Sequence, residues 1–472
     1  MKRTKIVATL GPSSSDAAVL ESMLHAGVNV FRVNFSHGSH EQHRGTIQTI
    51  RGILDRTGMT AAILADLQGP KLRVGNVEEG AIVNPGDRVT FTNQKCEGTK
   101  QRVYMTYTEF PNDVNPGETI LLDDGKLMMR VISTNRKDEV VAEVVQGGPL
   151  KSKKGVNLPN TRVSLPCLTE KDLADLKVAM EEGVDWIGLS FVRNAQDIKE
   201  LRTILNKNKN SAGIVAKIEK PEAVSDIERI LDETDGVMVA RGDLGVEVPL
   251  ESVPMIQKMI VAKAVERAKP VIVATQMMES MIDSMTPSRA EVNDVANAVL
   301  DGADAVMLSG ETSVGKYPVE VVATTAKIVA AAETSSINHI KERKPKKNDE
   351  RFVNNAICYQ AAKMANLVEA NAIATLTFSG YSAQLISSFR PKSNIYAFTS
   401  NRAILNKISL YWGVRGFYYD GMVSTDQSMM DITQKLREEK LVEEGDYIIQ
   451  LGSMPIQKRG TTNTMRIKKV GE

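Results

Sequence analysis

This 472-residue sequence has few cysteines, almost no net charge and no long apolar runs. Its three cysteines, Cys96, Cys167 and Cys358, lie far apart and form no CxxC or other metal-ligand spacing. A disulfide framework is therefore not expected, and reduced thiols of this kind are typical of a cytoplasmic protein. Lys and Arg number 59 against 58 Asp and Glu, a formal charge of +1. Such a balance argues against a nucleic-acid or acidic-membrane partner.

The sequence also lacks an obvious membrane-inserting segment. Its first residues, MKRTKIVATLGP, pass from basic residues directly into a short strand-like run, without the apolar stretch of a signal peptide. No apolar run elsewhere reaches the roughly 18 residues of a membrane span. We therefore expect a globular, cytoplasmic protein of two or three domains, because the chain exceeds the size of one ordinary domain.

Eight short β-branched runs define the main fold. Helical patterns separate most of them, such as the one after Thr286-Pro287 in which Val292, Val295 and Val299 recur at helical spacing. This alternation predicts an α/β fold, a (β/α)₈ TIM barrel whose active face lies at the C-terminal strand ends. The predicted strands are residues 6–10, 30–34, 62–66, 186–191, 214–218, 236–240, 271–275 and 305–308.

Two segments interrupt the alternation. After the third strand, strand-like runs separated by NPGD, NPGE and DDG predict a small inserted β-barrel domain, placed to act as a lid over the catalytic face. After the eighth unit, the charged segment HIKERKPKKNDERF is typical of a linker. We predict a catalytic barrel from residues 1–70 and 166–340, the lid from 71–165, and a C-terminal α/β regulatory domain from 341–472.

Charged side chains gather where the fifth and sixth strands are predicted to end. In IVAKIEKPEAV, Lys217 and Glu219 point to the same side of a strand, although this pair alone is better explained as a surface salt bridge. VMVARGDLGVEV adds Asp243 one strand over, and two such carboxylates suit Mg²⁺. The backbone N–H groups around Gly242 favour an anionic substrate group. VIVATQMMESM places Thr275 at the same barrel mouth.

Four further motifs occur along the chain: VFRVNFSHG, KSKKGVNLP, TPSRAEVNDVANAVLDGADAVMLSGETSVGKYPVE and GTTNTMRI. In order and spacing they resemble the pyruvate kinases over nearly the whole chain. The resemblance implies a glycolytic enzyme that transfers a phosphoryl group from phosphoenolpyruvate to ADP, giving pyruvate and ATP. It implies that Glu219 and Asp243 bind Mg²⁺, with Mn²⁺ as an alternative metal, and that Lys217 stabilises the phosphoryl group in flight.

The resemblance implies further roles. Arg32 would grip the phosphate, since a guanidinium fork suits phosphate oxygens. Thr275, with Gly242 and Asp243, would bind substrate, and Ser309 would join a hydroxyl and water relay that delivers the proton to C3 of enolpyruvate. Serines after strands often cap helices instead, which is the alternative for Ser309. The residues expected at the nucleotide are Asn34, Ser36, His37, Arg73 and Lys154, although a solvated turn is the alternative for Lys153-Lys154.

One departure from the family pattern concerns a monovalent cation. Many family members carry DTKGPEIR after the third strand, where Asn, Ser, Asp and a backbone carbonyl hold an activating K⁺. The corresponding residues here are Asn34, Ser36, Asp66 and Leu67, but the sequence is DLQGPKLR, with Lys71 in place of the acidic residue. A fixed ammonium can replace a mobile K⁺, so we expect no K⁺ requirement. A surface position at the lid hinge is the alternative for Lys71.

The C-terminal segment TFSGYS is similar to a loop that binds a phosphorylated effector in this family. Thr377, Ser379, Gly380 and Ser382 form a small hydroxyl-rich turn before a predicted helix, which suits a phosphate. An unoccupied structural turn is an equal alternative. A sugar monophosphate, a sugar bisphosphate and AMP all remain open as the effector, and the resemblance implies a homotetramer.

Two other functions are less favoured. A phosphoenolpyruvate/pyruvate-type aldolase or lyase can share the barrel and the Mg²⁺ carboxylates, but it needs neither the lid, Arg73 nor the MLSGET segment. A catalytically silent sugar-phosphate or nucleotide sensor would usually lack Lys217 or a metal ligand. Because all these features are present together, the site favours the kinase over both.

Overall fold

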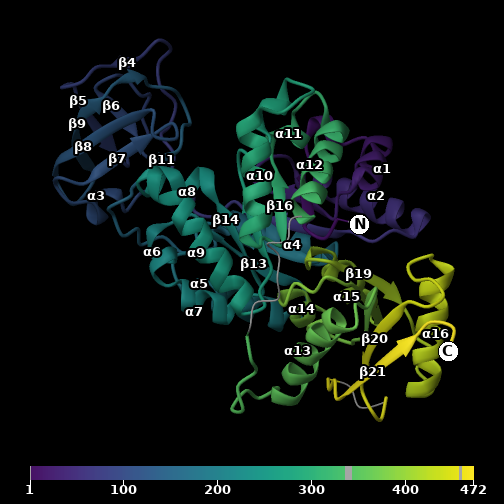
Figure 1. The fold of residues 1–472 in the computed structure, drawn as a ribbon. Coiled ribbons are helices and arrows are strands. Elements are labelled where there is room, and N and C mark those ends of the chain that lie inside the picture. The colour runs from purple at the N-terminus through teal and green to yellow at the C-terminus, as the bar shows by residue number, and fades with distance from the viewer. Residues whose placement is uncertain (1, 335–342, 457–459) are drawn as a thin grey trace.

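The computed structural model describes residues 2–334, 343–456 and 460–472. Figure 1 shows a central barrel surrounded by helices, an all-β segment projecting from one side, and an α/β segment at the other end. The predicted domain boundary at 340/341 lies outside the described residues, and all the domain bounds stay predictions. Within the described residues, no helix is long and apolar enough to cross a membrane.

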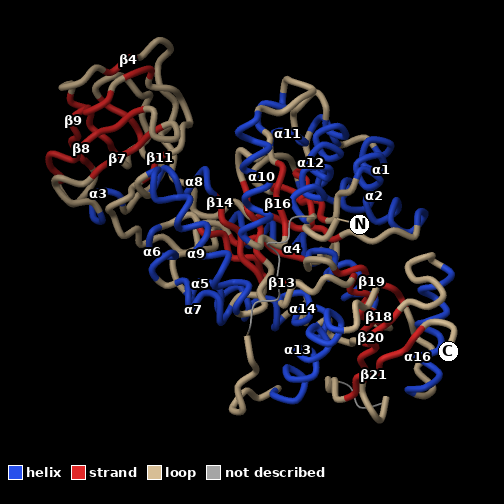
Figure 2. Tube along the Cα trace, viewed as in Figure 1, coloured by secondary structure: helices blue, strands red, loops and turns tan. Residues whose placement is uncertain are grey.

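A closed barrel of eight parallel strands forms the centre of the molecule, as predicted (Figure 2). Three predicted strands run beyond the observed ends. The first does so by one residue, and the other two end early because Phe191 (φ 54°) and Thr275 (φ 71°) turn the backbone into the left-handed region. The strands, in the order in which they pair around the barrel, are β1 (Lys5–Thr9), β16 (Ala305–Leu308), β15 (Val271–Ala274), β14 (Gly236–Ala240), β13 (Gly213–Ile218), β12 (Trp186–Leu189), β3 (Ala62–Asp66) and β2 (Val30–Asn34).

Helices cover the outside of the barrel, and several begin at a side chain that caps their free N–H groups. Ser288 accepts from the Glu291 N–H in a capping box, so the helix predicted after Thr286-Pro287 begins at Arg289. The helices are α1 (Ala17–Ala26), α2 (His40–Thr57), α4 (Glu170–Glu181), α5 (Ala195–Lys207), α6 (Pro221–Ser225), α7 (Ile227–Glu233), α8 (Arg241–Glu247), α9 (Val253–Glu266), α10 (Arg289–Asp301), α11 (Gly310–Ser313) and α12 (Pro318–Glu333).

The inside of the barrel changes from apolar to charged along its axis. Alternate strand residues point inward, because side chains on a strand alternate between its two faces. Near the N-terminal ends these are apolar residues such as Val30, Trp186 and Val215. Two residues further along, Arg32 and Lys217 take the same inward orientation. The strand register therefore gathers charge at the C-terminal mouth, as in other barrels of this class.

The insertion after β3, called the lid below, is built mainly of strands, as predicted, with one short helix. A six-stranded sheet and a two-stranded sheet enclose a core that includes Phe91, Phe110 and Val140. The elements are β4 (Ile82–Val83), β5 (Arg88–Thr92), β6 (Arg102–Tyr104), α3 (Phe110–Asp113), β7 (Thr119–Leu122), β8 (Leu127–Thr134), β9 (Glu139–Gln146), β10 (Gly148–Pro149) and β11 (Val156–Asn157). Its core is separate from that of the barrel, so the lid is attached through its two chain connections and a few side-chain contacts.

The C-terminal segment packs under the N-terminal end of the barrel. Trp186 lies edge-on to Tyr411, and its indole Nε1 donates to the Lys407 carbonyl at 3.1 Å. Arg390 pairs with the buried Asp304 at 3.0 Å. The elements are α13 (Phe352–Leu367), β17 (Ala372–Leu376), α14 (Tyr381–Ser388), β18 (Asn394–Thr399), α15 (Arg402–Lys407), β19 (Val414–Tyr418), α16 (Thr425–Glu438), β20 (Tyr447–Gly452) and β21 (Thr464–Lys469), with β21 antiparallel in an otherwise parallel sheet.

Candidate active site

Lys217 is the centre of a buried charged network at the barrel mouth. Its ammonium lies 3.0 Å from Glu219 Oε1 and 3.2 Å from Asp66 Oδ1, and it donates to Ser190 Oγ at 2.7 Å. Arg32 approaches Asp66 from the other side, with Nη2 and Oδ2 2.6 Å apart. The side chains of Arg32 and Lys217 are each 11 % exposed. Two cations are thus held together in a largely water-free site.

The protonation of this network follows from its charges. Burial lowers the pKa of Lys217, but the carboxylates of Asp66 and Glu219 outweigh burial and raise that pKa above its ordinary value. Burial raises the pKa of Asp66, yet Lys217 and Arg32 offset burial and lower the pKa overall. The raised pKa keeps Lys217 protonated, which suits a fixed cation rather than a general base.

Glu219 and Asp243 lie together at the mouth, on neighbouring strand ends. Glu219 is buried and accepts from the Phe191 N–H at 2.8 Å. Burial raises its pKa, Lys217 lowers it, and the charge of Asp243 raises it further. Asp243 lies in the first turn of α8. Their mutual repulsion is what a bound cation would relieve.

Thr275 is held in place by the loop after β14. Its hydroxyl accepts from the Gly242 N–H at 2.7 Å, and the Arg241 guanidinium donates to the Thr275 carbonyl at 2.6 Å. Arg241 is anchored in turn by Asp294 on α10. The structure thus brings Thr275, Gly242 and Asp243 to one edge of the mouth, as predicted.

Ser309 follows β16 at the same mouth and stands at the N-terminus of α11. Its N–H donates to the buried carboxylate of Glu311 at 2.6 Å, and the other oxygen of Glu311 accepts from the Met278 N–H at 3.0 Å. No side-chain cap from Ser309 to its helix is seen, so the capping alternative for its hydroxyl is not supported within the described residues. Glu311 ties the loops after β15 and β16 together.

The ends of β2 and β3 carry the residues predicted for a monovalent cation or for nucleotide. Asn34 lies opposite Asp66 in the strand register, and Asn34 Oδ1 accepts from the Ser36 N–H at 3.1 Å. The Leu67 carbonyl accepts from Ser190 Oγ at 2.7 Å. His37 is exposed on the loop that follows. Apart from His37, these groups therefore pack around the base of the charged network.

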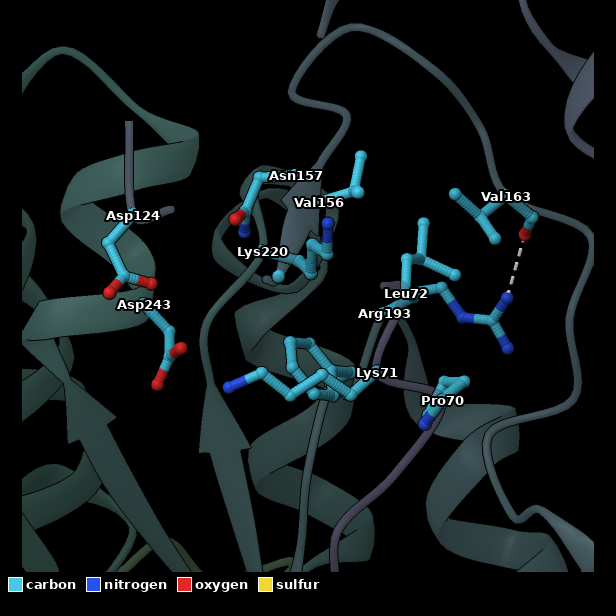
Figure 3. A pocket seen from close by; sticks show the side chains of 12 residues that line it. Pro70, Lys71, Leu72, Asp124, Val156, Asn157, Val163, Arg193, Lys220 and Asp243 are labelled. Atoms are coloured by element: carbon cyan, nitrogen blue, oxygen red, sulfur yellow. Dashed lines mark hydrogen bonds between the residues drawn. The ribbon is translucent and has the colours of Figure 1, made fainter. Parts of the chain in front are cut away.

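Lys71 lies on the wall of a pocket between the barrel and the lid (Figure 3). Its side chain extends across the pocket toward Asp243, and within the described residues it makes no ion pair, with Asp66 or with any other acid. The pocket encloses about 40 Å³. Its walls are Pro70, Lys71, Leu72, Asp124, Gly155, Val156, Asn157 and Val163 from the lid and its connections, and Phe191, Arg193, Lys220 and Asp243 from the barrel.

The two lid residues predicted to bind nucleotide lie outside this pocket. Lys154 forms an ion pair with Asp123 at 2.9 Å. Arg73 donates to the Lys153 carbonyl at 3.0 Å and lines a different cavity, which it shares with Tyr104 and Cys96. In this arrangement of lid and barrel, neither residue reaches the charged network around Lys217.

Sequence reasoning missed three residues that build the site: Ser190, Arg241 and Glu311. Ser190 joins Lys217 to the Leu67 carbonyl, and its signal was a hydroxyl directly after the fourth strand. Arg241 and Glu311 act on backbone groups, holding Thr275 and Ser309 in position. A single sequence carries no mark that distinguishes such side chains from ordinary surface charges.

The predicted effector loop lines a cavity of about 270 Å³ in the C-terminal segment. Thr377, Ser379 and Ser382 all contribute, and Arg351 adds a cation. Thr377 Oγ1 accepts from the Gly380 N–H at 3.0 Å, in a turn where Gly380 has φ 81°. The loop is therefore an ordered turn beside a cavity, which leaves both of its interpretations standing.

A (β/α)₈ barrel with paired cations at its mouth is typical of an enzyme that binds an anionic substrate. Two family models match the chain: the pyruvate kinase barrel domain over residues 1–322 and the pyruvate kinase alpha/beta domain over residues 355–468. The chain belongs to the pyruvate kinase family, and it is a phosphotransferase.

Individual relatives agree with this assignment. A pyruvate kinase of Staphylococcus epidermidis is 43% identical over 474 residues, covering 100% of this chain and 81% of the relative. One of Corynebacterium glutamicum is 42% identical over 476 residues, covering 100% and 98%. A crystal structure of a pyruvate kinase from Cryptosporidium parvum superimposes with a TM-score of 0.92 at 34% identity, covering 99% of this chain and 96% of that one.

Proposed function

We propose that the barrel mouth binds phosphoenolpyruvate and transfers its phosphoryl group to ADP in glycolysis, with Arg32 and Lys217 as the cations that meet the phosphoryl charge. The observation that carries the proposal is the buried ammonium of Lys217, kept protonated by Asp66 and Glu219. Phosphoryl transfer relies on positioned cations rather than on a protein nucleophile. A fixed, desolvated ammonium beside a guanidinium provides that stabilisation without reorganisation.

Glu219 and Asp243 are the proposed metal ligands. Mg²⁺ takes one or two protein carboxylates and fills its remaining positions with water and substrate oxygens, so a pair of carboxylates is sufficient. Mg²⁺ fits this pair best, and Mn²⁺ is the alternative. The bound metal would neutralise charge on the substrate carboxylate and on the transferring phosphoryl group.

Thr275 and Ser309 are the proposed polar groups around the carbon end of the substrate. Thr275 is fixed by Gly242 and Arg241, so its hydroxyl is held at one position on the mouth. Ser309 is placed by the contact of its N–H with Glu311. A relay of such hydroxyls and water would deliver the proton to C3 of enolpyruvate, because the raised pKa of Lys217 makes its ammonium a poor proton donor.

ADP would occupy the space between the barrel mouth and the lid. The proposed contacts on the barrel come from Asn34, Ser36 and His37, and those on the lid from Arg73 and Lys154. For the lid residues to reach nucleotide, the lid must move relative to the barrel, and Lys154 must exchange its bond to Asp123 for one to a phosphate. Closure of a lid over substrate excludes water from the transfer.

The monovalent cation is proposed to be unnecessary. Lys71 is exposed near the mouth, and within the described residues its ammonium makes no ion pair with an acid. Asn34, Ser36, Asp66 and Leu67 would then need no K⁺ to balance the substrate charge.

A phosphorylated effector is proposed for the cavity beside the loop of Thr377, Ser379, Gly380 and Ser382. Arg351 supports this choice, because a guanidinium at a cavity lined by hydroxyls suits a phosphate. The ligand class is a sugar phosphate or AMP. A homotetramer in the cytoplasm is the proposed working state, and the free, buried thiols of Cys167 and Cys358 suit a reducing compartment.

The test is pyruvate formation from phosphoenolpyruvate and ADP at increasing Mg²⁺, with Asp243→Asn as the variant and Asp124→Asn as its matched control on the same pocket. Asp243→Asn should raise the Mg²⁺ concentration for half-maximal rate by at least about tenfold, or 1.4 kcal/mol. Direct Mn²⁺ binding, measured by electron paramagnetic resonance, should weaken in parallel. Equal effects of both variants would contradict the assigned ligand, and absence of turnover in the wild type would contradict the function.

A further inference from the structure

A buried ion pair at the barrel mouth is one point where the lid touches the loops of the active site. Lys220 Nζ lies 2.6 Å from Glu247 Oε1, with side-chain exposures of 14 % and 1 %. The same oxygen accepts from Asn157 Nδ2 of the lid at 2.8 Å. Asn157 is the last residue of β11, whereas Lys220 and Glu247 belong to the barrel. A single carboxylate oxygen therefore joins three separate segments.

Glu247 depends on these two donors. Within the described residues its second oxygen, Oε2, is buried and has no hydrogen-bond partner. A buried carboxylate is costly unless it is paired and hydrogen-bonded. The stabilisation of this charge accordingly comes through Oε1, from the ammonium of Lys220 and from the amide of Asn157. The lid thus helps to satisfy a barrel charge that has no access to water on that side.

This contact lies next to both proposed metal ligands. Lys220 directly follows Glu219 in the loop after β13. Glu247 follows Asp243 by four residues on α8, which places both carboxylates on the same face of that short helix. The two segments that carry the metal ligands therefore both contact the lid, in addition to Arg193, which donates to the Val163 and Leu165 carbonyls at 2.9 and 2.8 Å. Lys220, Asn157 and Asp243 also line one pocket (Figure 3).

We infer that Asn157, Glu247 and Lys220 are positioning residues that anchor one side of the lid to the metal-binding loops, so that the lid turns about this contact when it moves to reach nucleotide. Without the bond from Asn157, the lid is attached to this side of the barrel by fewer contacts and samples more orientations. The nucleotide must then order the lid when it binds. Its apparent affinity therefore falls in proportion to the fraction of molecules whose lid is correctly placed. The inference rests on the proposed function, because it assumes that ADP binds between lid and barrel.

Asn157→Ala is the direct test, with Asn93→Ala as the matched control. Asn93 is also a half-buried lid asparagine, but its amide donates to the Thr108 and Lys137 carbonyls inside the lid. Loss of a hydrogen bond to a charged group predicts about a tenfold rise in the KM for ADP for Asn157→Ala. The KM for phosphoenolpyruvate and the kcat at saturating ADP should change by less than about threefold, because the reacting groups are not touched. Asn93→Ala should leave all three constants near wild type.

A second measurement does not depend on catalysis. Small-angle X-ray scattering of the ligand-free full-length protein should show a broader distribution of shapes for Asn157→Ala and for Lys220→Met than for Asn93→Ala. An unchanged KM for ADP, or an equal rise in the control, would overturn the inference. Unchanged scattering would also overturn it. Failure of the proposed function is separate, since it would appear as missing turnover in the wild-type enzyme.

Discussion

Replacement of Lys217 by methionine tests the charged network most sharply. The substitution keeps the length of the side chain and removes the ammonium that lies 3.0 Å from Glu219 and 3.2 Å from Asp66. A unit charge about 4 Å from that ammonium is stabilised by about 4 kcal/mol at an effective dielectric constant near 20. If the phosphoryl group gains this charge in the transition state, kcat should fall by about 10³-fold, since each 1.36 kcal/mol is a factor of ten.

Pyruvate formation at saturating substrates is the assay, and the folded state must be verified alongside it. Lys217→Met removes the ion-pair partner of the buried Glu219 and leaves the buried Asp66 with Arg32. Breaking such a network costs about 3–5 kcal/mol of stability. Lys217→Arg keeps the charge and provides a variant that should fold. Lys258→Met is the matched control, because Lys258 pairs with the largely buried Asp301 between α9 and α10. A folded Lys217→Met enzyme with kcat within tenfold of wild type would refute the assignment.

Three further predictions concern other parts of the molecule. The initial rate of the wild type should be the same in Tris buffer with or without KCl, whereas Lys71→Glu should make the rate rise with added KCl; a K⁺ requirement in the wild type would contradict the role of Lys71. Because the cations Lys217 and Arg32 lower the pKa of Asp66 below its unfolded value of 3.8, this group stabilises the fold fully above that pH and loses the contribution as pH falls through the folded-state pKa. In urea unfolding, the free energy of unfolding of Asp66→Asn should therefore fall less steeply with decreasing pH in the acid range than that of the wild type. Arg351→Ala should raise the concentration of a phosphorylated effector needed for half-maximal response by at least about tenfold, and an unchanged concentration would argue for an empty structural turn.

The barrel could be predicted from the sequence because its signal is repeated eight times. Each strand is a short β-branched run between helical patterns, and one uncertain segment does not alter the pattern. The strand ends were less accurate at residues 190–191 and 275, where backbone turns with positive φ stop the strands. Nothing in the composition of these segments indicates such a turn, since the residues that adopt it, Phe191 and Thr275, are not glycine.

The candidate site was predictable where charge falls at a strand end, as with Lys217 and Glu219. The lid was harder, because the position of a unit with its own core depends on contacts between distant segments. Lys154 is engaged by Asp123, and Arg73 lines a separate cavity. The Asn157 to Glu247 bond joins residues 90 positions apart. A single sequence holds no information on which distant polar side chains meet across two separate cores.

The N-terminal end of the barrel, called the floor below, has a consequence for the construction of hybrid enzymes. Inward-facing strand residues such as Trp186 and Val215 share one continuous apolar core with Tyr411 and Ile386 of the C-terminal segment. That segment therefore closes the barrel from below and is not an independent attachment. A chimera that borrows effector specificity by exchanging this segment would have to transplant the complementary floor residues with it, or the exposed indole and its neighbours would favour aggregation.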